Sequence, residues 1–401
     1  MKRARRGGRS GAKPTIVSLY SGCGGFDVGF EAAGFEPVAA FDIDPQAVTV
    51  FNANIRSVAR VQDLSESSPS VGSPDVLLAG APCQGFSTSG KRLFGDPRNH
   101  LLVRAGEIAV ALRPKVFVLE NVPAALSGSH SKHWYRVEEL LRHQGYNVRR
   151  FLAAGVESGV AQLRNRVFMI AWLGSDCVRI EPSPRKSLTL RTSLAGLDTA
   201  STLDAERLSS ESDKGKIARC IAPGQKLSNV RGGPSSVHTW QIPEVYGEVS
   251  RKEVELLNTL LVLRRRDRRR QFGDADPVRA SKLTNTLGWD STETLKRLVV
   301  KGFIRRIGGY VDLVHTYNGK FRRLQWDAPS PTVDTHFGDP CLFLHPTSHR
   351  GFSSREAARI QGFPDRFSFT EGRAASFRMI GNAVPPPMSE RIAEFVRDCL
   401  I

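Results

Sequence analysis

Cys83 lies where the apolar run "DVLLAG" gives way to the glycine- and serine-rich stretch "GFSTSGKRLFGDPRN". A thiolate is a strong nucleophile, and nearby cations favour it by lowering the thiol pKa. Glu120 ends the apolar run "FVLEN", and Arg164 and Arg166 stand two apart in "QLRNR". A carboxylate that ends an apolar strand is costly to bury unless it has a partner or a function. Together these residues predict a pocket with a nucleophile, a proton donor and two guanidinium groups. Taken alone, Cys83 could simply be a thiol packed at the end of a strand.

The other five cysteines give no sign of shared chemistry. They lie far apart and form no C-x-x-C pair, so the pattern predicts neither a disulfide framework nor a zinc site. We expect most of them to be inert buried thiols: Cys23, Cys177, Cys220, Cys341 and Cys399.

A glycine-rich segment, "SLYSGCGGFDVGF", predicts a ligand-binding turn between a strand and a helix. Gly22, Gly24 and Gly25 would let backbone amides approach a ligand closely at the helix N-terminus. The dinucleotide pattern G-x-G-x-x-G fails, because Asp27 stands where the third glycine should be. The segment therefore favours a nucleoside cofactor without a pyrophosphate, and the alternative is a tight turn with no ligand.

Three acidic residues follow the next predicted strands. Asp42 and Asp44, about twenty residues after the glycines, could accept hydrogen bonds from ribose hydroxyls. Asp63 could do the same for an adenine amino group. The run "FDIDP" leaves the choice between Asp42 and Asp44 open.

Strand-like and helix-like segments alternate from Thr15 to Gly174, which predicts a mostly parallel sheet with helices on both faces. Ligands of such sheets bind beyond the carboxyl ends of the strands. The catalytic candidates, the glycine turn and the three acidic residues are all expected there. The predicted strands are 15–20, 37–43, 74–80, 115–122, 147–154 and 166–174, and the predicted helices are 27–34, 44–55, 100–112 and 133–145.

The middle of the chain differs in composition. Residues 175–250 are rich in Ser, Pro and Gly with weak periodicity, and a helix ending in "RRRDRRR" follows. Helix, turn, helix and a hairpin around Gly308 then suggest a winged helix-turn-helix over 250–315. Thr292, Lys296 and Arg297 would lie on its recognition helix. The alternative is a packing module whose basic face is merely solvated.

Charge indicates a polyanionic partner. The 401 residues include 57 Lys and Arg against 40 Asp and Glu, a net charge of +17, with a pI of about 10.0. Nucleic acid is the simplest partner for such a chain. We found no apolar run that could span a membrane and no apolar signal core, and expect a cytoplasmic, nucleoid-associated protein. Residues 1–13 read as a basic disordered tail.

Six motifs, in order, resemble the DNA (cytosine-5) methyltransferase family: "SGCGGF", "PCQGFS", "ENV", "QLRNR", "REAARIQGFP" and "GNAVPPPM". The resemblance implies a Rossmann-like α/β domain that binds S-adenosyl-L-methionine, with a smaller target-recognition domain inserted. It divides the chain into the first part of the catalytic domain (14–174), the target-recognition domain (175–345) and the returning catalytic part (346–401).

The resemblance also implies a covalent mechanism on a cytosine flipped out of duplex DNA. Cys83 would add to carbon 6, Glu120 would contact N3 and the exocyclic amine, and Arg164 and Arg166 would hold O2 and nearby anions. No metal is implied.

The remaining roles that the resemblance implies concern the cofactor and the DNA. One departure from the family is Ser18, where many members have Asp, and another is Tyr20, where Phe is usual. Cofactor contacts would come from Tyr20, Ser21, Gly22, Cys23, Gly24, Gly25, Asp42, Ile43, Asp63, Leu64, Pro82, Asn382 and Val384. DNA contacts would come from Ser87, Ser89, Lys91, Arg92, Arg98, Thr332 and Val333, with the loop after Cys83 closing over the DNA.

We expect double-stranded DNA as the partner of a monomer, with a cognate restriction endonuclease as a second partner. The nearest alternative is a tRNA cytosine-5 methyltransferase of the same fold, which the large basic insert disfavours. A catalytically dead DNA-binding regulator is disfavoured because Cys83, Glu120 and both arginines are present.

Overall fold

The computed structural model describes residues 12–82, 100–174, 182–270 and 273–400. These residues form two compact units. The first comprises Met1–Leu197, Asp327–Thr335 and Ser354–Ile401, and the second comprises Asp198–Trp326 and His336–Ser353.

This division differs from the predicted domain boundaries at three places. Residues 182–197 and 327–335 belong to the first unit and not to the inserted domain, and 346–353 belong to the second. Backbone hydrogen bonds explain the first two shifts. Ser330 exchanges them with Ala161 and Leu163, and the Leu190 amide donates to the Ala328 carbonyl.

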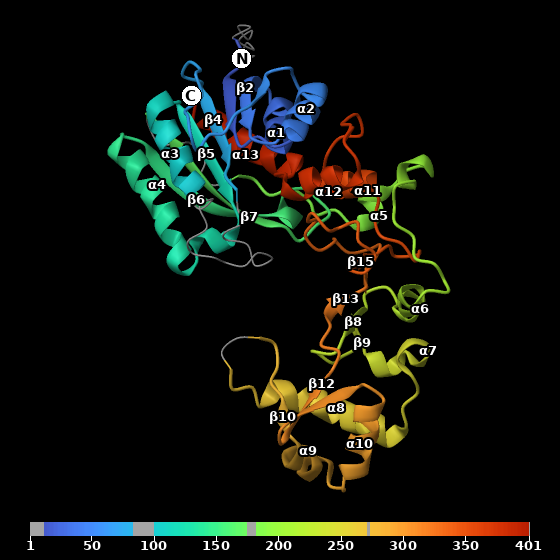
Figure 1. The fold of residues 1–401 in the computed structure, drawn as a ribbon. Helices are drawn as coiled ribbons and strands as arrows, with labels where there is room; N and C mark the ends of the chain where they lie inside the picture. The colour runs from blue at the N-terminus through green and yellow to red at the C-terminus, as the bar shows by residue number, and fades with distance from the viewer. Residues whose placement is uncertain (1–11, 83–99, 175–181, 271–272, 401) are drawn as a thin grey trace, which may run out of the picture. The chain divides into compact units, whose positions relative to one another are not determined.

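A seven-stranded sheet forms the centre of the first unit, in the order β3-β2-β1-β4-β5-β7-β6 (Figure 1). Strands β1 to β5 are parallel, and β7 runs antiparallel to both β5 and β6. The strands are β1 Thr15–Leu19, β2 Glu36–Asp42, β3 Ala59–Val61, β4 Val76–Gly80, β5 Val116–Asn121, β6 Asn147–Ala154 and β7 Asn165–Trp172. The predicted Rossmann-like sheet is confirmed, with the short strand β3 added.

Helices cover both faces of this sheet because successive side chains of a strand point to opposite faces, and here both sets are apolar. Val17 of β1 faces α3 and α4 together with Trp134, whereas Ile16 faces α1 and α13 together with Phe30. The helices of this unit are α1 Gly25–Ala32, α2 Pro45–Asn54, α3 His100–Leu112, α4 Ser131–His143, α5 Leu190–Leu194, α11 Ser354–Gln361, α12 Arg373–Asn382 and α13 Pro386–Asp398. Short 3₁₀ turns lie at Pro123–Leu126, Gly128–His130 and Gly155–Glu157.

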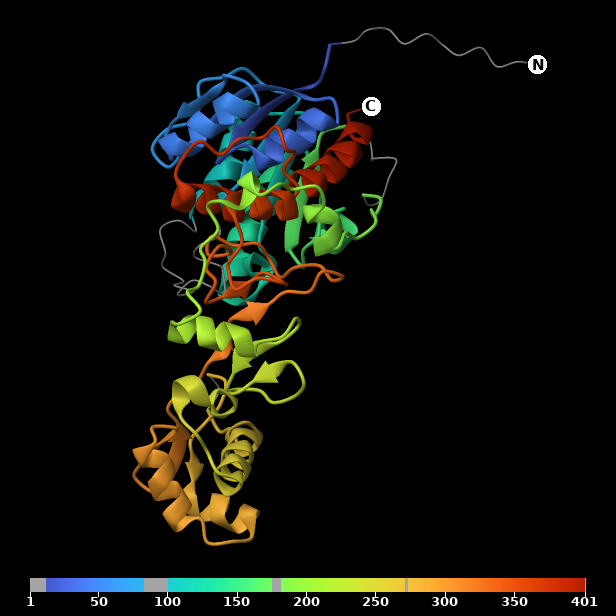
Figure 2. The same ribbon diagram turned by 90° about the vertical axis from the view of Figure 1, so that its right-hand side faces the viewer.

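The C-terminal helix α13 packs directly on α1, although more than 350 residues separate the two (Figure 2). Gly29 makes this possible, since a Cβ there would overlap the backbone of Pro386 and Glu390. The Ser389 hydroxyl also donates to the Phe26 carbonyl. This packing brings the segment before α13 to the glycine turn.

The second unit contains three small sheets, β10-β12-β11, β13-β8-β9 and β14-β15. Its strands are β8 Lys226–Ser228, β9 Ser236–Val237, β10 Val278–Arg279, β11 Ile304–Ile307, β12 Tyr310–Leu313, β13 Asn318–Lys320, β14 Arg322–Arg323 and β15 Phe343–Leu344. Its helices are α6 Asp213–Cys220, α7 Pro243–Tyr246, α8 Arg251–Arg266, α9 Ala280–Leu287 and α10 Thr292–Val300, with 3₁₀ turns at Ala200–Thr202 and Thr239–Gln241.

Within the second unit, α8, β10, α9, α10, β11 and β12 share one apolar core. Gly288, with φ of 74°, ends α9 in the left-handed conformation that favours glycine, and α10 starts four residues later. Strands β11 and β12 form a hairpin around Gly308 and Gly309. This is the element order of a winged helix.

Cys399 departs from the expectation of free thiols, because it is disulfide-bonded. Cys23, Cys220 and Cys341 are free. Across the described ranges no helix has both the length and the apolar character needed to cross a membrane.

Candidate active site

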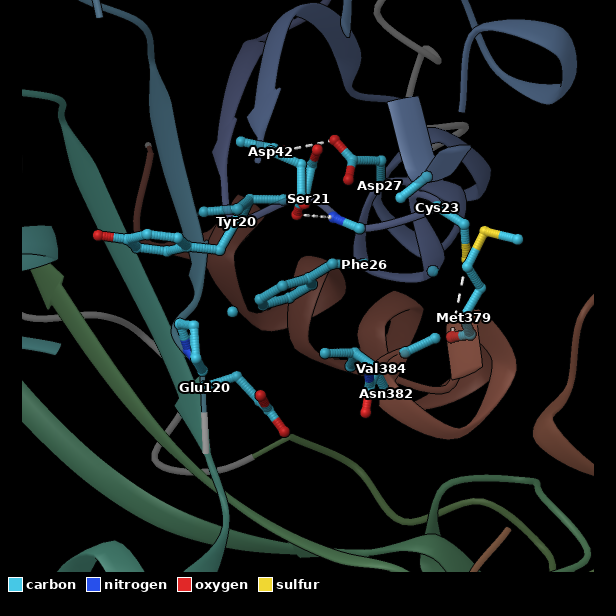
Figure 3. Close-up of a pocket in the computed structure, with 18 of the residues that line it drawn as sticks. Tyr20, Ser21, Cys23, Phe26, Asp27, Asp42, Glu120, Met379, Asn382 and Val384 are labelled. Atoms are coloured by element: carbon cyan, nitrogen blue, oxygen red, sulfur yellow. Dashed lines mark hydrogen bonds between the residues drawn. The ribbon is translucent and has the colours of Figure 1, made fainter. Parts of the chain in front are cut away.

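A pocket of about 310 Å³ opens in the first unit at the carboxyl ends of β1, β2, β4 and β5. In Figure 3, Tyr20 and Glu120 lie on one side of this pocket, with Asn382 and Val384 across from them. The lining residues are Ser18, Leu19, Tyr20, Ser21, Gly22, Cys23, Gly25, Phe26, Asp27, Asp42, Asp44, Ala47, Leu78, Gly80, Ala81, Pro82, Glu120, Arg164, Arg166, Arg378, Met379, Gly381, Asn382, Ala383 and Val384.

The turn between β1 and α1 is shaped by left-handed backbone. Tyr20, Gly22 and Gly24 have φ of 54°, 53° and 91°. Gly24 is required twice over, because a Cβ there would also overlap Ile55 and Phe51. The Ser21 hydroxyl is buried in the pocket wall and has no hydrogen-bond partner among the described residues. The turn thus presents a polar group and the N-terminus of α1 to a ligand.

Asp42 braces this turn. Its Oδ2 accepts from the Gly22 amide at 2.7 Å, and its Oδ1 accepts from the Asp44 amide at 2.9 Å. Burial raises the pKa of Asp42, while these two amides oppose the shift. Asp44 caps α2 through the Gln46 amide and pairs with Arg378 at 2.8 Å. Both acids line the pocket, but Asp44 is already paired with a cation.

Ser18 and Asp27 form a buried polar pair in the wall of the pocket. Their exposed fractions are 1% and 0%, and the Ser18 hydroxyl donates to Asp27 Oδ1. Asp27 Oδ2 has no hydrogen-bond partner among the described residues. Burial raises the pKa of Asp27 to about 7. Sequence reasoning treated Asp27 only as a break in the glycine pattern. The signal it missed was a carboxylate between apolar residues in the first turn of a helix.

Glu120, at the end of β5, pairs with Arg166, at the start of β7. Arg166 Nε lies 2.8 Å from Glu120 Oε1, and the two side chains are 12% and 10% exposed respectively. Burial raises the pKa of Glu120, and the charges of Arg166 and Arg164 oppose that shift. The antiparallel register of β5 and β7 brings the two side chains together.

Asn121, the last residue of β5, anchors the backbone after β4 at Ala81. Its side-chain amide donates to the Ala81 carbonyl at 3.2 Å, and its side-chain oxygen accepts from the Val122 amide. Ala81 and Pro82 line the pocket. The backbone that leads to Cys83 is therefore anchored beside Glu120.

Arg164 lines the same pocket but is held by backbone carbonyls, and its expected contact with the base stays a prediction. It is only 1% exposed, and its guanidinium donates to the carbonyls of Val333, Gly381 and Ala383 at 2.9–3.1 Å. These bonds orient Arg164 toward backbone carbonyls, so it ties β7 to two distant segments. Arg166 makes a direct bond to the Glu120 carboxylate through its Nε.

Val333 differs from expectation, whereas the DNA contact expected of Thr332 stays a prediction. Val333 is fully buried, and its amide donates to the Gln162 side chain, so its side chain cannot face DNA. Thr332 is half-buried, and its hydroxyl donates to the Leu163 carbonyl at 3.2 Å. Both belong to the first unit.

Besides Gly24, three predicted cofactor contacts lie outside the pocket lining. Ile43 is 64% exposed, and Leu64 is buried in the sheet core. Asp63 accepts hydrogen bonds from the Ser65 amide and hydroxyl in a local turn. Cofactor contacts by these three residues stay predictions.

The other predicted contacts have mixed outcomes. Cys83 and the predicted DNA contacts Ser87, Ser89, Lys91, Arg92 and Arg98 lie outside the described residues. Tyr20, Ser21, Gly22, Cys23, Gly25, Asp42, Pro82, Asn382 and Val384 all line the pocket, whereas Gly24 shapes the turn behind it. Burial raises the pKa of Cys23 to about 12, as expected of an inert thiol.

Comparison with known proteins places this site in a family. Residues 14–397 match the C-5 cytosine-specific DNA methylase family. The chain therefore belongs to this family, and it is a DNA (cytosine-5) methyltransferase.

Particular relatives agree over nearly the whole length. The Type II methyltransferase M.DdeI of Desulfomicrobium norvegicum is 30% identical, covering 94% of this chain and 87% of its own. The Type II methyltransferase M.AgeI of Thalassovita gelatinovora is 28% identical, covering 95% and 98%. An E. coli prophage protein described as a DNA modification methyltransferase shares the fold, with a TM-score of 0.60, 23% identity and coverage of 97% and 99%.

Proposed function

We propose that this enzyme transfers a methyl group from S-adenosyl-L-methionine to carbon 5 of a cytosine flipped out of a specific duplex DNA sequence, through a covalent adduct with Cys83. The Glu120–Arg166 pair carries the proposal. It supplies a buried carboxylate with a raised pKa and a fixed cation in the same pocket as the glycine turn. That combination suits a base whose ring nitrogen must gain a proton.

The pocket fits the proposed cofactor, which would supply an electrophilic methyl group on a sulfonium. Asp42, with lone pairs left beside its two amide bonds, would accept from the ribose hydroxyls. Asp42 is preferred to Asp44, since Asp44 is paired with Arg378. The unsatisfied oxygens of Ser21 and Asp27 would serve the charged amino-acid end of the cofactor. A cation there would favour the ionised form of Asp27.

The chemistry on the cytosine begins at Cys83. Its thiolate would form a bond to carbon 6, while N3 takes a proton from the Glu120 carboxyl, so that carbon 5 becomes the nucleophilic end of an enamine. Carbon 5 would then take the methyl group, whose bond to the sulfonium sulfur would break to leave a neutral thioether. Loss of the carbon 5 proton to a base and elimination across carbons 5 and 6 would return the thiolate, and return of the N3 proton to Glu120 would restore the ring.

Arg166 and Asn121 would act on this chemistry from either side of Glu120. Arg166 would hold the carboxyl in place through its Nε and offer its remaining N–H donors to the base O2. Asn121 would fix the Ala81 carbonyl, two residues before Cys83. Arg164 would serve as a positioning residue only.

Duplex DNA is the proposed substrate over tRNA. Relatives across the whole length are named Type II methyltransferases, and the net charge of +17 suits a polyanion. By analogy with those names, we propose that the enzyme acts as a monomer in the cytoplasm, at the nucleoid, as the modification partner of a restriction endonuclease.

Bisulfite sequencing tests the proposed reaction and reveals the target. The protein and its Cys83→Ser variant would be expressed in a host that lacks cytosine methylation. Protected cytosines at one recurring sequence, absent with the variant, are the expected result. Uniform conversion of the DNA from cells that contain soluble protein would contradict the proposal, and tRNA would be the next substrate to test.

A further inference from the structure

The three-stranded sheet β10-β12-β11 of the second unit has two different faces. Val278, Val311 and Leu313 point into the apolar core of the module. The opposite face carries Arg279, Tyr310 and Ile307 in one cross-strand row, and Arg305 beside Asp312 in the next. We call the set Arg269, Arg279, Arg305, Ile307 and Tyr310 the wing face.

Two arginines of the wing face converge on one tyrosine. The guanidinium carbons of Arg269 and Arg279 lie 5.7 and 5.5 Å from the centre of the Tyr310 ring, and Arg279 Nε donates to the Tyr310 hydroxyl at 3.1 Å. Hydrogen bonds from both arginines lower the pKa of Tyr310, with the positive charges adding to the effect. Neither arginine has a carboxylate partner among the described residues.

Arg305 adds further positive charge to this face. It pairs with Asp312 at 3.0 Å, but Asp312 also takes a bond from the buried Arg264 at 2.6 Å. One carboxylate thus faces two guanidinium groups, which leaves an excess of one positive charge. Ile307, which is 46% exposed, supplies an apolar contact beside them.

The basic side chains of the predicted recognition helix α10 differ from those of the wing face in their ion pairs. Lys296 pairs with Glu293 at 2.7 Å, and Arg297 and Lys301 both pair with Glu253 at 3.4 and 2.8 Å. Thr292 is engaged by the Asp290 side chain. Each basic residue of α10 therefore has a carboxylate partner within the module, although Arg297 and Lys301 share one, whereas Arg269 and Arg279 of the wing face have none among the described residues.

We propose that the wing face binds the phosphate backbone of duplex DNA next to the target site, and that α10 is not the main contact. The inference rests on the proposed function for its choice of duplex DNA. Arginine is suited to phosphate because its planar fork donates two parallel bonds. Neutralising each phosphate releases counterions, so such contacts give salt-dependent affinity without reading sequence.

Salt-dependent binding of the full-length enzyme to an unmethylated duplex tests this inference. The variant Arg269→Gln/Arg279→Gln removes two charges without breaking an ion pair. The control Arg251→Gln/Lys296→Gln removes two exposed charges from α8 and α10. The variant Arg269→Lys/Arg279→Lys keeps the charges. Thermal melts would show whether each protein is folded.

We expect Arg269→Gln/Arg279→Gln to weaken binding about tenfold, and the slope of log affinity against log salt to fall by about 2. The lysine variant should keep most of that slope, and the control should bind like wild type. Equal losses in the glutamine variant and the control, or a larger loss in the control, would overturn the inference. Stronger competition by RNA of equal length than by the duplex would overturn the choice of DNA.

Failure of this inference can be told from failure of the proposed function. If the wild type methylates DNA and the wing-face variant binds with unchanged slope, only the wing face is excluded. If the wild type neither binds nor methylates any DNA, the proposed function itself fails, whatever the variants do.

Discussion

Arg166 Nε lies 2.8 Å from Glu120 Oε1, and this pair sits in the pocket wall where the antiparallel strand β7 meets the parallel strand β5. Two opposing effects act on the pKa of Glu120. Burial favours its protonated form, and the guanidinium favours its ionised form. A carboxyl balanced in this way can both give and take back a proton during one catalytic cycle.

Replacing Glu120 by Gln should lower kcat about 10²- to 10⁴-fold, because glutamine keeps the shape but cannot transfer a proton. Methyl incorporation into duplex DNA would measure this, with Glu139→Gln on the exposed surface of α4 as the control. Unchanged turnover by Glu120→Gln would remove Glu120 from the chemistry.

Substitution of Arg164 should mainly lower stability, and substitution of Arg166 should mainly lower the catalytic rate. Arg164→Met would remove the Arg164 bonds to the buried carbonyls of Val333, Gly381 and Ala383, of which Ala383 keeps the Gln361 side-chain amide as a donor. It should lower the free energy of unfolding by about 3 kcal/mol. Arg166→Met should cost less stability but lower kcat, since it removes the partner of Glu120. Denaturant unfolding and the rate assay would be compared. The opposite pattern would show that the expected direct role of Arg164 was right.

Asp27 should make stability fall as pH rises. Its pKa is about 7 in the folded protein against 3.8 when unperturbed, so the folded state holds an extra proton between those values. Stability then declines from about pH 4 to pH 7 and stays low above it. Asp27→Asn should remove this decline and raise the melting temperature at pH 8 by a few degrees, at about 1.4 kcal/mol for each pKa unit.

Cofactor binding gives Asp27 a second readout. The same Asp27→Asn variant should bind S-adenosyl-L-methionine more weakly in calorimetry, whereas Glu157→Gln, an exposed change of equal charge, should not. Unaltered binding by Asp27→Asn would make the buried carboxylate a purely structural group.

Gly29→Ala tests the contact that brings the C-terminal segment to the pocket. An alanine Cβ would overlap the backbone of Pro386 and Glu390, so we expect α1 and α13 to separate and the protein to lose about 2 kcal/mol of stability. Gly72→Ala, with nothing within 4 Å of the new Cβ, is the control. Equal melting temperatures for the two variants would argue against tight α1–α13 packing.

The strands of the sheet could be predicted because each one is marked by residues that lie close together in the sequence. Apolar runs such as 76–80 and the glycines after β1 mark strands and a turn by themselves. The positions of Glu120 and Arg166 were also predictable, as both stand at strand ends. Neither prediction required knowing which side chains meet across the fold.

Long-range partners could not be read in the same way. Nothing local indicates that Arg164 bonds to carbonyls about 170 and 220 residues away, or that Val333 is buried beneath it. Likewise, the compensation of Arg297 by Glu253 depends on how α8 packs against α10. In both cases tertiary packing engages a charged side chain in a way that its neighbours in the sequence do not reveal.

The most direct test of the central claim is to trap the covalent intermediate. A duplex carrying 5-fluorocytosine at the target found by bisulfite sequencing would block the final elimination, because fluorine cannot leave as a proton does. We predict a stable protein–DNA adduct that needs S-adenosyl-L-methionine, maps to Cys83 by mass spectrometry and is absent from Cys83→Ser. An active enzyme that forms no adduct, or an adduct on another residue, would contradict the account.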